Sequence, residues 1–345
     1  MKEPHTQLAG QGGSDLRTAA LTSIPVEIQW LEGNISSAQG AVLLSRWLRG
    51  GLTKRHCSAA LQGGQSCADR ADPTQRHQHR CERAAACAAD WAFPQAGAPQ
   101  HRTATVLVRP ASDRALGCVG ATQRAELVLL GSTAPVRLLS ALSEVTMALT
   151  QPRGPLARTP PVRAVALGVP RSWRLQEAAA QWQGVQRWRV NLHTPWVLEK
   201  RAGNQSLARA SDALQRFAQH VAQRAYKLAS LLAAEGMQQK NHAPPNGALA
   251  HQMALRAREA CAAALSCLQV TEVHVNMVQW SDHSASTAQV LQPMGLEGGF
   301  TLQVRPGPTA LTDASTAGPW LAMMQVMGLG EGTAEGFGSA AVQPA

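Results

Sequence analysis

Hydrophobic positions recur along this chain with two different periods, which mark out an ordered series of elements. Short stretches rich in β-branched residues have the composition of strands, whereas longer stretches with an apolar residue every three or four positions are typical of amphipathic helices. In the first half the pattern predicts strands at Val26–Trp30, Thr103–Arg109, Ala125–Leu130 and Val162–Leu167, and helices at 38–54 and 135–149. The order is strand, helix, strand, strand, helix, strand.

The second half repeats most of this series. It predicts strands at Arg187–Leu192, 272–280 and 299–304, and helices at 212–234, 248–266 and 319–327. Strand, helix, strand, strand, helix, strand is the order of a ferredoxin-like domain. We therefore predict an α+β protein with two tandem ferredoxin-like (RRM-like) domains, 1–185 and 186–345, and an Arg- and Cys-rich helical insertion at about 57–100 in the first.

The charge of the chain indicates what kind of partner it binds. The 345 residues carry a net charge of +10, and residues 46–109 hold ten Lys or Arg against four acids, whereas residues 271–345 hold one Arg against six. Arginine offers a planar fork that fits phosphate oxygens, so we expect a polyanion such as RNA. With one Tyr and four Phe the chain is poor in stacking groups, which favours recognition of RNA by charge and shape.

The chain also lacks the marks of a membrane or secreted protein. It has no run of 18 or more apolar residues, and its N-terminus has no apolar centre like that of a secretory signal. We expect a cytoplasmic protein that does not bind a membrane and whose seven cysteines stay reduced.

A glycine-rich segment lies close to the C-terminus. Gly328–Gly338 contains five glycines at near-alternating positions, as where a backbone must approach another group closely. It has no Lys-Ser or Lys-Thr after a glycine, and Thr333 and Glu335 stand where a dinucleotide motif would need its third glycine. A nucleotide-binding loop is therefore not expected here.

Four short motifs stand in order along the chain. They are the Leu-Arg-Gly helix at Leu48–Leu52 followed by Cys57, the Thr-Pro strand at His193–Leu198, the strand end at Trp280–Ser284 with the turn at Met294–Gly299, and the glycine-rich segment at Gly328–Gly338. In order and spacing they resemble the CRISPR-associated endoribonucleases that process precursor CRISPR RNA, members of the RAMP superfamily. The chain departs from that pattern at Glu331 and Glu335, where the family often has Lys or Arg.

The resemblance implies metal-independent cleavage of precursor CRISPR RNA at its repeat hairpin, with the product retained. In this reaction the 2′-hydroxyl attacks the adjacent phosphate and leaves a 2′,3′-cyclic phosphate. The step needs a proton acceptor, a proton donor for the leaving oxygen, and cations near the phosphate. The alternative is a non-catalytic RAMP subunit that binds RNA in a CRISPR ribonucleoprotein complex without cutting it. Other subunits of such a complex are expected partners, and no cofactor is expected.

Family members commonly place a catalytic histidine near the end of the first helix, where this chain has His56. Because histidine titrates near neutral pH, we expect His56 to act as general base or acid. Lys54 and Arg55 would hold the scissile phosphate. Arg46 and Arg49 of the same helix are further candidate catalytic residues, which would align the backbone if arginines dominate the site.

Several alternatives to this catalytic site stay open. His193 and His283 also lie in family-like motifs, and a site made of arginines alone is another interpretation. His56 is otherwise a surface residue at a basic helix end, or a metal ligand beside Cys57.

The remaining candidates bind RNA or a structural metal. The expected RNA contacts are Arg55, Arg70, Arg76, Arg80 and Arg83 in the first domain, Arg216, Arg224 and Lys227 on the long helix of the second, and Gly330, Gly332 and Gly336 in the glycine-rich segment. Cys57, Cys67, Cys81 and Cys87 could hold a structural zinc, but they form no Cys-x-x-Cys pair and the pattern is weak. No catalytic metal is expected.

Overall fold

The computed structural model describes residues 16, 19–30, 35–56, 88, 92, 105–110, 122–132, 134–150, 162–180, 182–199, 214, 216–241, 247–279, 294–307, 310–330 and 337–345. These residues form two compact units. The N-terminal unit is Leu21–Ser172, and the C-terminal unit runs from Trp173 onward and includes the described residues up to Ala20.

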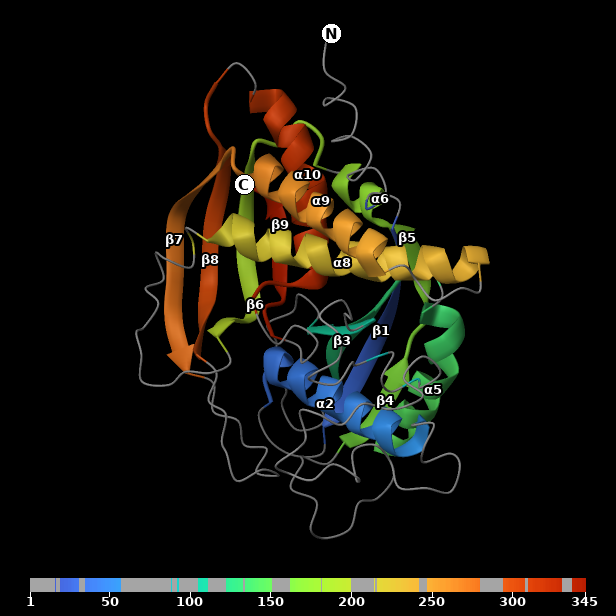
Figure 1. Cartoon of the computed structure of the whole chain (residues 1–345). Coiled ribbons are helices and arrows are strands. Elements are labelled where there is room, and N and C mark those ends of the chain that lie inside the picture. Colours follow the sequence, from blue (N-terminus) through green and yellow to red (C-terminus); the bar gives the residue numbers. More distant parts are fainter. Residues whose placement is uncertain are drawn as a thin grey trace. The chain divides into compact units, whose positions relative to one another are not determined.

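The N-terminal unit has the element order of a ferredoxin-like fold (Figure 1). The elements are β1 (Ala20–Trp30), α2 (Ser37–His56), β2 (Val106–Pro110), β3 (Thr122–Leu130), α5 (Ala134–Leu149) and β4 (Val162–Leu167). The strands form an antiparallel sheet in the order β2-β3-β1-β4, and the short strand β5 (Arg171–Arg174) also pairs with β1.

The core of this unit lies between one sheet face and the two helices. Alternate residues of β1, from Ile24 to Trp30, are at most 1% exposed, as the two-residue period of a strand requires. Trp30 packs against Trp47 of α2 with ring centroids 5.5 Å apart, and its indole N–H donates to Oε1 of Gln123 at 2.8 Å. The largest core side chain therefore has its polar atom satisfied, which avoids the cost of an unpaired buried donor.

The C-terminal unit repeats the strand order with different helices. Its elements are α6 (Leu175–Ala180), β6 (Arg187–Glu199), α8 (Phe217–Asn241), α9 (Gly247–Leu265), β7 (Leu268–Gln279), β8 (Met294–Val304), α10 (Ala310–Met327) and β9 (Ala340–Pro344). The sheet is antiparallel in the order β7-β8-β6-β9, so β6 and β8 are central as β1 and β3 are in the other unit. The predicted tandem of ferredoxin-like folds is confirmed.

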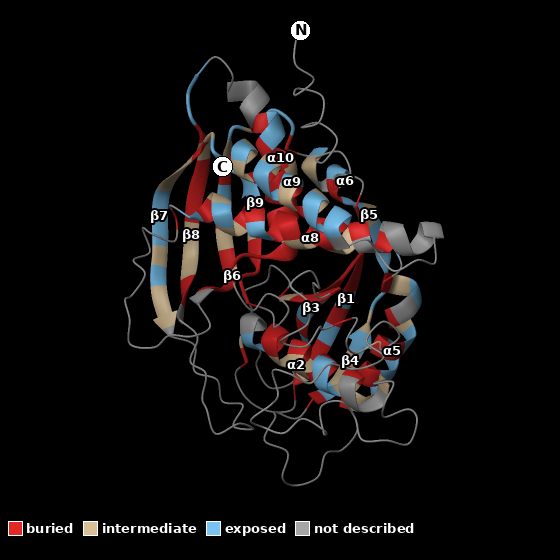
Figure 2. Cartoon of the chain, in the orientation of Figure 1, coloured by how far each residue is buried: buried red, intermediate tan, exposed pale blue. Residues whose placement is uncertain are grey.

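Burial alternates from Trp188 to Thr194 along β6, one of the two central strands of this second sheet, and the next three residues are all buried (Figure 2). Trp188, Val190 and Trp196 of β6 are completely buried, whereas Arg189 between them is exposed. Trp196 also packs against Phe217 and Phe300, with ring centroids 6.3 Å away in both cases. Apart from Trp173, the aromatic residues that the structure describes are thus buried, where they cannot serve as a base-stacking platform.

Two of the predicted element ends that differ from the structure lie at or near a proline. A helix was expected to begin at Pro319, but α10 begins at Ala310 and contains this proline internally. The first strand of the second domain was expected to end at Leu192, but β6 continues through Pro195 to Glu199. The pairing of β6 with β8 shifts register between Leu192 and Trp196, so the missing N–H of the proline falls at an irregularity.

The predicted insertion at 57–100 lies almost wholly outside the described residues. Within it only Ala88 and Ala92 are described; both are helical and pack against the core of the N-terminal unit. In the described part of the chain no helix has the length and apolar character needed to cross a membrane.

Candidate catalytic site

The two helices of the N-terminal unit approach closely near the end of α2. A Cβ built on Gly51 would lie only 2.3 Å from Cγ1 of Val145 in α5, so a side chain at position 51 would push the helices apart. His56, the last residue of α2, follows five positions later, and Glu144 precedes Val145. The crossing therefore brings an imidazole and a carboxylate together.

The contact between His56 and Glu144 is short. Nε2 of His56 lies 2.9 Å from Oε2 of Glu144, and the two side chains are 18% and 55% exposed. The distance is that of an ion pair with a protonated ring, although the carboxylate does not lie along the Nε2–H direction as a hydrogen bond would require. Nε2 itself is buried, so Nδ1 is the ring nitrogen left for another molecule.

Arginines of α2 lie on the same side of the helix as this histidine. Arg46, Arg49 and His56 fall within about 80° of one another around the axis, because each residue of an α-helix advances by about 100°. Arg46 is half-buried, Arg49 is exposed, and both have interaction partners. Lys54 and Arg55 belong to the last turn of α2, and their side chains lie outside the described residues.

The basic residues of α8 are not a uniformly solvated stripe. Arg216, just before the helix, is exposed, and Lys227 is half-buried. Arg224 is only 5% exposed and has interaction partners, so its guanidinium lies within the unit. A buried arginine can belong to an amphipathic helix only when its charge is satisfied, a condition that helix periodicity alone does not reveal.

Gly330 of the C-terminal glycine-rich segment packs against β6. Gly330 has a φ of 70°, and a Cβ there would lie 2.2 Å from the carbonyl oxygen of Val197 and 2.4 Å from Cδ1 of Trp196. Only glycine tolerates both the left-handed conformation and this approach. Close packing against β6 therefore explains why residue 330 is a glycine.

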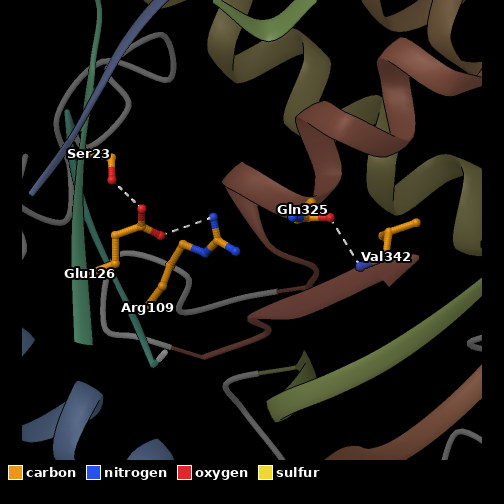
Figure 3. Close-up of polar contacts among 5 residues, drawn as sticks. All are labelled: Ser23, Arg109, Glu126, Gln325 and Val342. Carbon is orange, nitrogen blue, oxygen red and sulfur yellow. Dashed lines mark hydrogen bonds and ion pairs between the residues drawn. The ribbon is translucent and has the colours of Figure 1, made fainter. Parts of the chain in front are cut away.

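Hydrogen bonds tie the same segment into the sheet of its unit. The N–H of Leu329 donates to the carbonyl of Gly338 at 2.8 Å, and the N–H of Gly338 donates to the carbonyl of Pro195 at 2.9 Å. On the neighbouring strand the N–H of Val342 donates to Oε1 of Gln325 at 3.1 Å (Figure 3). The end of α10 and the start of β9 are therefore fixed to the middle of the C-terminal sheet.

Other predicted residues lie apart from these contacts or outside the described residues. His193 lies in β6, where its N–H donates to the carbonyl of Ser339 at 2.8 Å. The predicted residues not described are His283, Arg70, Arg76, Arg80, Arg83, Cys57, Cys67, Cys81, Cys87, Gly332 and Gly336. Among the residues that are described, no three His, Cys, Asp or Glu side chains are placed to hold a metal ion.

Sequence reasoning missed a second ionic cluster, on the sheet of the N-terminal unit (Figure 3). Arg109 of β2 lies directly opposite Glu126 of β3, with Nη1 and Oε2 3.7 Å apart, and the hydroxyl of Ser23 donates to the other oxygen of this carboxylate. Burial lowers the pKa of the Arg109 guanidinium, and the charge of Glu126 opposes that shift. Both residues lie in strands that the sequence predicts, but the sequence does not give the register that places Arg109 opposite Glu126.

Glu144 was missed for a similar reason. It lies on the exposed side of a helix whose apolar positions alone carried the sequence signal. Its distance to His56 depends on how α2 and α5 cross, which no local pattern specifies.

No protein-family model and no curated protein sequence matches this chain. Solved structures similar to it include several Cas6 proteins. A Cas6 product complex has a TM-score of 0.49 and 15% identity, covering 94% of this chain and 100% of that one. Thermus thermophilus Cas6 has a TM-score of 0.44 and 13% identity, covering 94% and 99%. In a partial Cas6-RT-Cas1–Cas2 complex the values are 0.46 and 12%, covering 95% of this chain and 46% of that one.

Proposed function

We propose that this protein is a metal-independent endoribonuclease that cleaves precursor CRISPR RNA at the repeat hairpin and stays bound to the product. The observation that carries the proposal is the end of α2, where His56 lies beside Glu144 and shares a helix face with Arg46 and Arg49. Such a group combines a side chain that can move a proton near neutral pH with cations that can hold a phosphate.

The proposed step uses these residues in separate roles. Nδ1 of His56 takes the proton of the 2′-hydroxyl, and the 2′-oxygen forms a bond to the adjacent phosphorus. The bond from phosphorus to the 5′-oxygen breaks, and that oxygen takes a proton from a water molecule, while His56 returns its own proton to the solvent. The products are a 2′,3′-cyclic phosphate and a 5′-hydroxyl. Arg46, Arg49 and Lys54 would stabilise the negative charge that builds up on the phosphate oxygens.

Binding of the RNA would rest mainly on charge. The net charge of +10 favours a nucleic-acid partner, whose affinity falls as salt rises. We propose contacts from Arg55, Arg216 and the arginines of the insertion, and we propose other subunits of a CRISPR effector complex as protein partners. The remaining predicted RNA contacts, Arg224, Lys227, Gly330, Gly332 and Gly336, keep that role as predictions.

One experiment separates this function from that of a non-cutting RNA-binding subunit. The purified chain is incubated in EDTA with end-labelled repeat RNA from the CRISPR array nearest its gene. We expect a single cut that a 2′-deoxy substitution at the scissile position abolishes, while the substituted RNA binds with unchanged affinity. Tight binding of an RNA that stays intact would contradict the proposal and support the non-catalytic subunit.

A further inference from the structure

We infer that Glu144 is the residue that positions His56 for catalysis, an inference that rests on the proposed function. The carboxylate belongs to α5, not to the helix that carries the histidine, so it is a separate support for the ring. Its oxygen, 2.9 Å from Nε2, selects which ring nitrogen can face an RNA molecule.

The helix crossing holds this pair together. An ion pair between two flexible surface side chains contributes little, because holding both in one geometry costs conformational entropy. Here the ring is 18% exposed and its Nε2 is buried, and α2 and α5 are fixed against each other at Gly51 and Val145. The Glu144 side chain, which is 55% exposed, is the less constrained of the two partners.

The consequence is a defined proton path. A carboxylate at Nε2 favours the tautomer with the proton on that nitrogen, which leaves the lone pair of Nδ1 to accept the proton of the 2′-hydroxyl. After that transfer the ring is a cation beside an anion, so the charge formed during the reaction is stabilised in place. The proton on Nε2 does not move, and Glu144 touches neither the RNA nor the transferred proton.

The chain offers a matched set of variants for this inference. Glu144→Ala removes the carboxylate, and Glu144→Gln keeps an oxygen that can accept from Nε2–H. Glu27→Ala breaks an exposed ion pair with Arg124, 3.3 Å long, elsewhere in the same unit and serves as the control for loss of a surface charge. Each is also made together with His56→Ala, since residues that act through one another are not additive.

The measurement is the single-turnover rate of repeat-RNA cleavage with the full chain in excess, alongside RNA affinity and melting temperature. We expect Glu144→Ala to slow cleavage by about tenfold, the low end of what orienting partners of a functional histidine contribute, because the carboxylate is half exposed. Glu144→Gln should restore most of that loss, Glu27→Ala should cut like the unaltered chain, and affinity and melting temperature should hardly change. In the His56→Ala background Glu144→Ala should cost nothing further.

Three results would overturn the inference, and the one that also overturns the proposed function can be told apart from the other two. If His56→Ala slows cleavage but Glu144→Ala does not, or if Glu144→Ala slows the His56→Ala variant as much as it slows the unaltered chain, Glu144 does not position His56 and the proposed function stands. If the unaltered chain leaves the RNA intact, the proposed function fails and the positioning role fails with it.

Discussion

The two units have the same strand order, but the close approach of the backbone in each unit brings different chemical groups together. In the N-terminal unit, Gly51 lets α2 approach α5, and the result is a histidine beside a carboxylate. In the C-terminal unit, Gly330 lets the segment after α10 approach β6, and the groups brought together there are the Trp196 ring and backbone carbonyls. A repeated fold therefore does not repeat its chemistry, because only one of the two close approaches joins titratable side chains.

The largest effect should come from removing His56, the imidazole that lies beside a carboxylate at the close approach of the N-terminal unit. General acid–base catalysis typically contributes about a hundredfold to ten-thousandfold, so His56→Ala should lower the single-turnover cleavage rate by that order while RNA affinity stays the same. His251→Ala is the matched control, since that imidazole is bonded through Nδ1 to the Tyr226 hydroxyl at 2.8 Å in the C-terminal unit. Unchanged cleavage in His56→Ala would move the catalytic role to His193, His283 or the arginines.

A second prediction concerns stability in the C-terminal unit. Gly330→Ala places a Cβ against the Val197 carbonyl and the Trp196 ring in a left-handed conformation, and we expect a loss of about 2–4 kcal/mol in the free energy of unfolding. Gly307→Ala, where nothing lies within 4 Å of a built Cβ, should change it by less than about 0.5 kcal/mol. Urea denaturation measures both. Equal stability of the two variants would show that the close approach at Gly330 is not rigid.

Neighbouring glycines of α2 allow the corresponding comparison in the N-terminal unit. Gly51→Ala meets Val145 and should destabilise by about 1–3 kcal/mol, less than Gly330→Ala because a side chain yields more easily than backbone. Gly50→Ala, with open space at its Cβ, should stabilise by about 0.5–1 kcal/mol through helix propensity.

Cleavage should separate these two α2 variants as well. Gly51→Ala displaces the carboxylate of α5 from His56, so we expect it to cut more slowly, whereas Gly50→Ala should cut at the normal rate. The idea that this crossing sets up the site would fail if Gly51→Ala were destabilised but cut at the normal rate.

The element order could be predicted because buried positions need apolar residues, and these recur in the sequence with the period of a helix or a strand. Val162–Leu167 was predicted with the bounds that β4 has, and the helix expected at 135–149 differs from α5 by one residue at its start. Strands were less well delimited: β1 begins six residues before the predicted Val26, because buried polar residues, Thr22 and Ser23, and the exposed Pro25 interrupt its apolar pattern. The local sequence pattern therefore locates the elements, whereas pairing with neighbouring strands sets how far a strand extends.

The candidate site could be predicted only in part, because its geometry comes from contacts that are distant in sequence. His56, the last residue of α2, was predicted only from its position near the end of the first helix. Its neighbour Glu144 is brought close by a helix crossing that depends on Gly51, and Arg224 is buried although its spacing fits a solvated face. Distances between side chains of different elements follow from packing, which a single sequence does not display.

The smallest effect should be a pH dependence in the C-terminal unit. Hydrogen bonds from Arg187 and from the Thr301 hydroxyl lower the pKa of the Glu272 carboxyl, which lies at a bulge of β7. A carboxyl whose folded-state pKa is below its unfolded value stabilises the protein above the unfolded pKa, and this contribution disappears as the pH falls through the folded pKa. Glu272→Gln should therefore melt slightly below the unaltered chain at pH 7, and the difference should vanish on acidification below about pH 4, near the ordinary pKa of glutamate. Melting temperatures between pH 3 and 7 measure this, with Glu259→Gln on α9 as the surface control. A difference between Glu272→Gln and the unaltered chain that stays constant with pH would mean that the loss comes from side-chain packing and not from the charge.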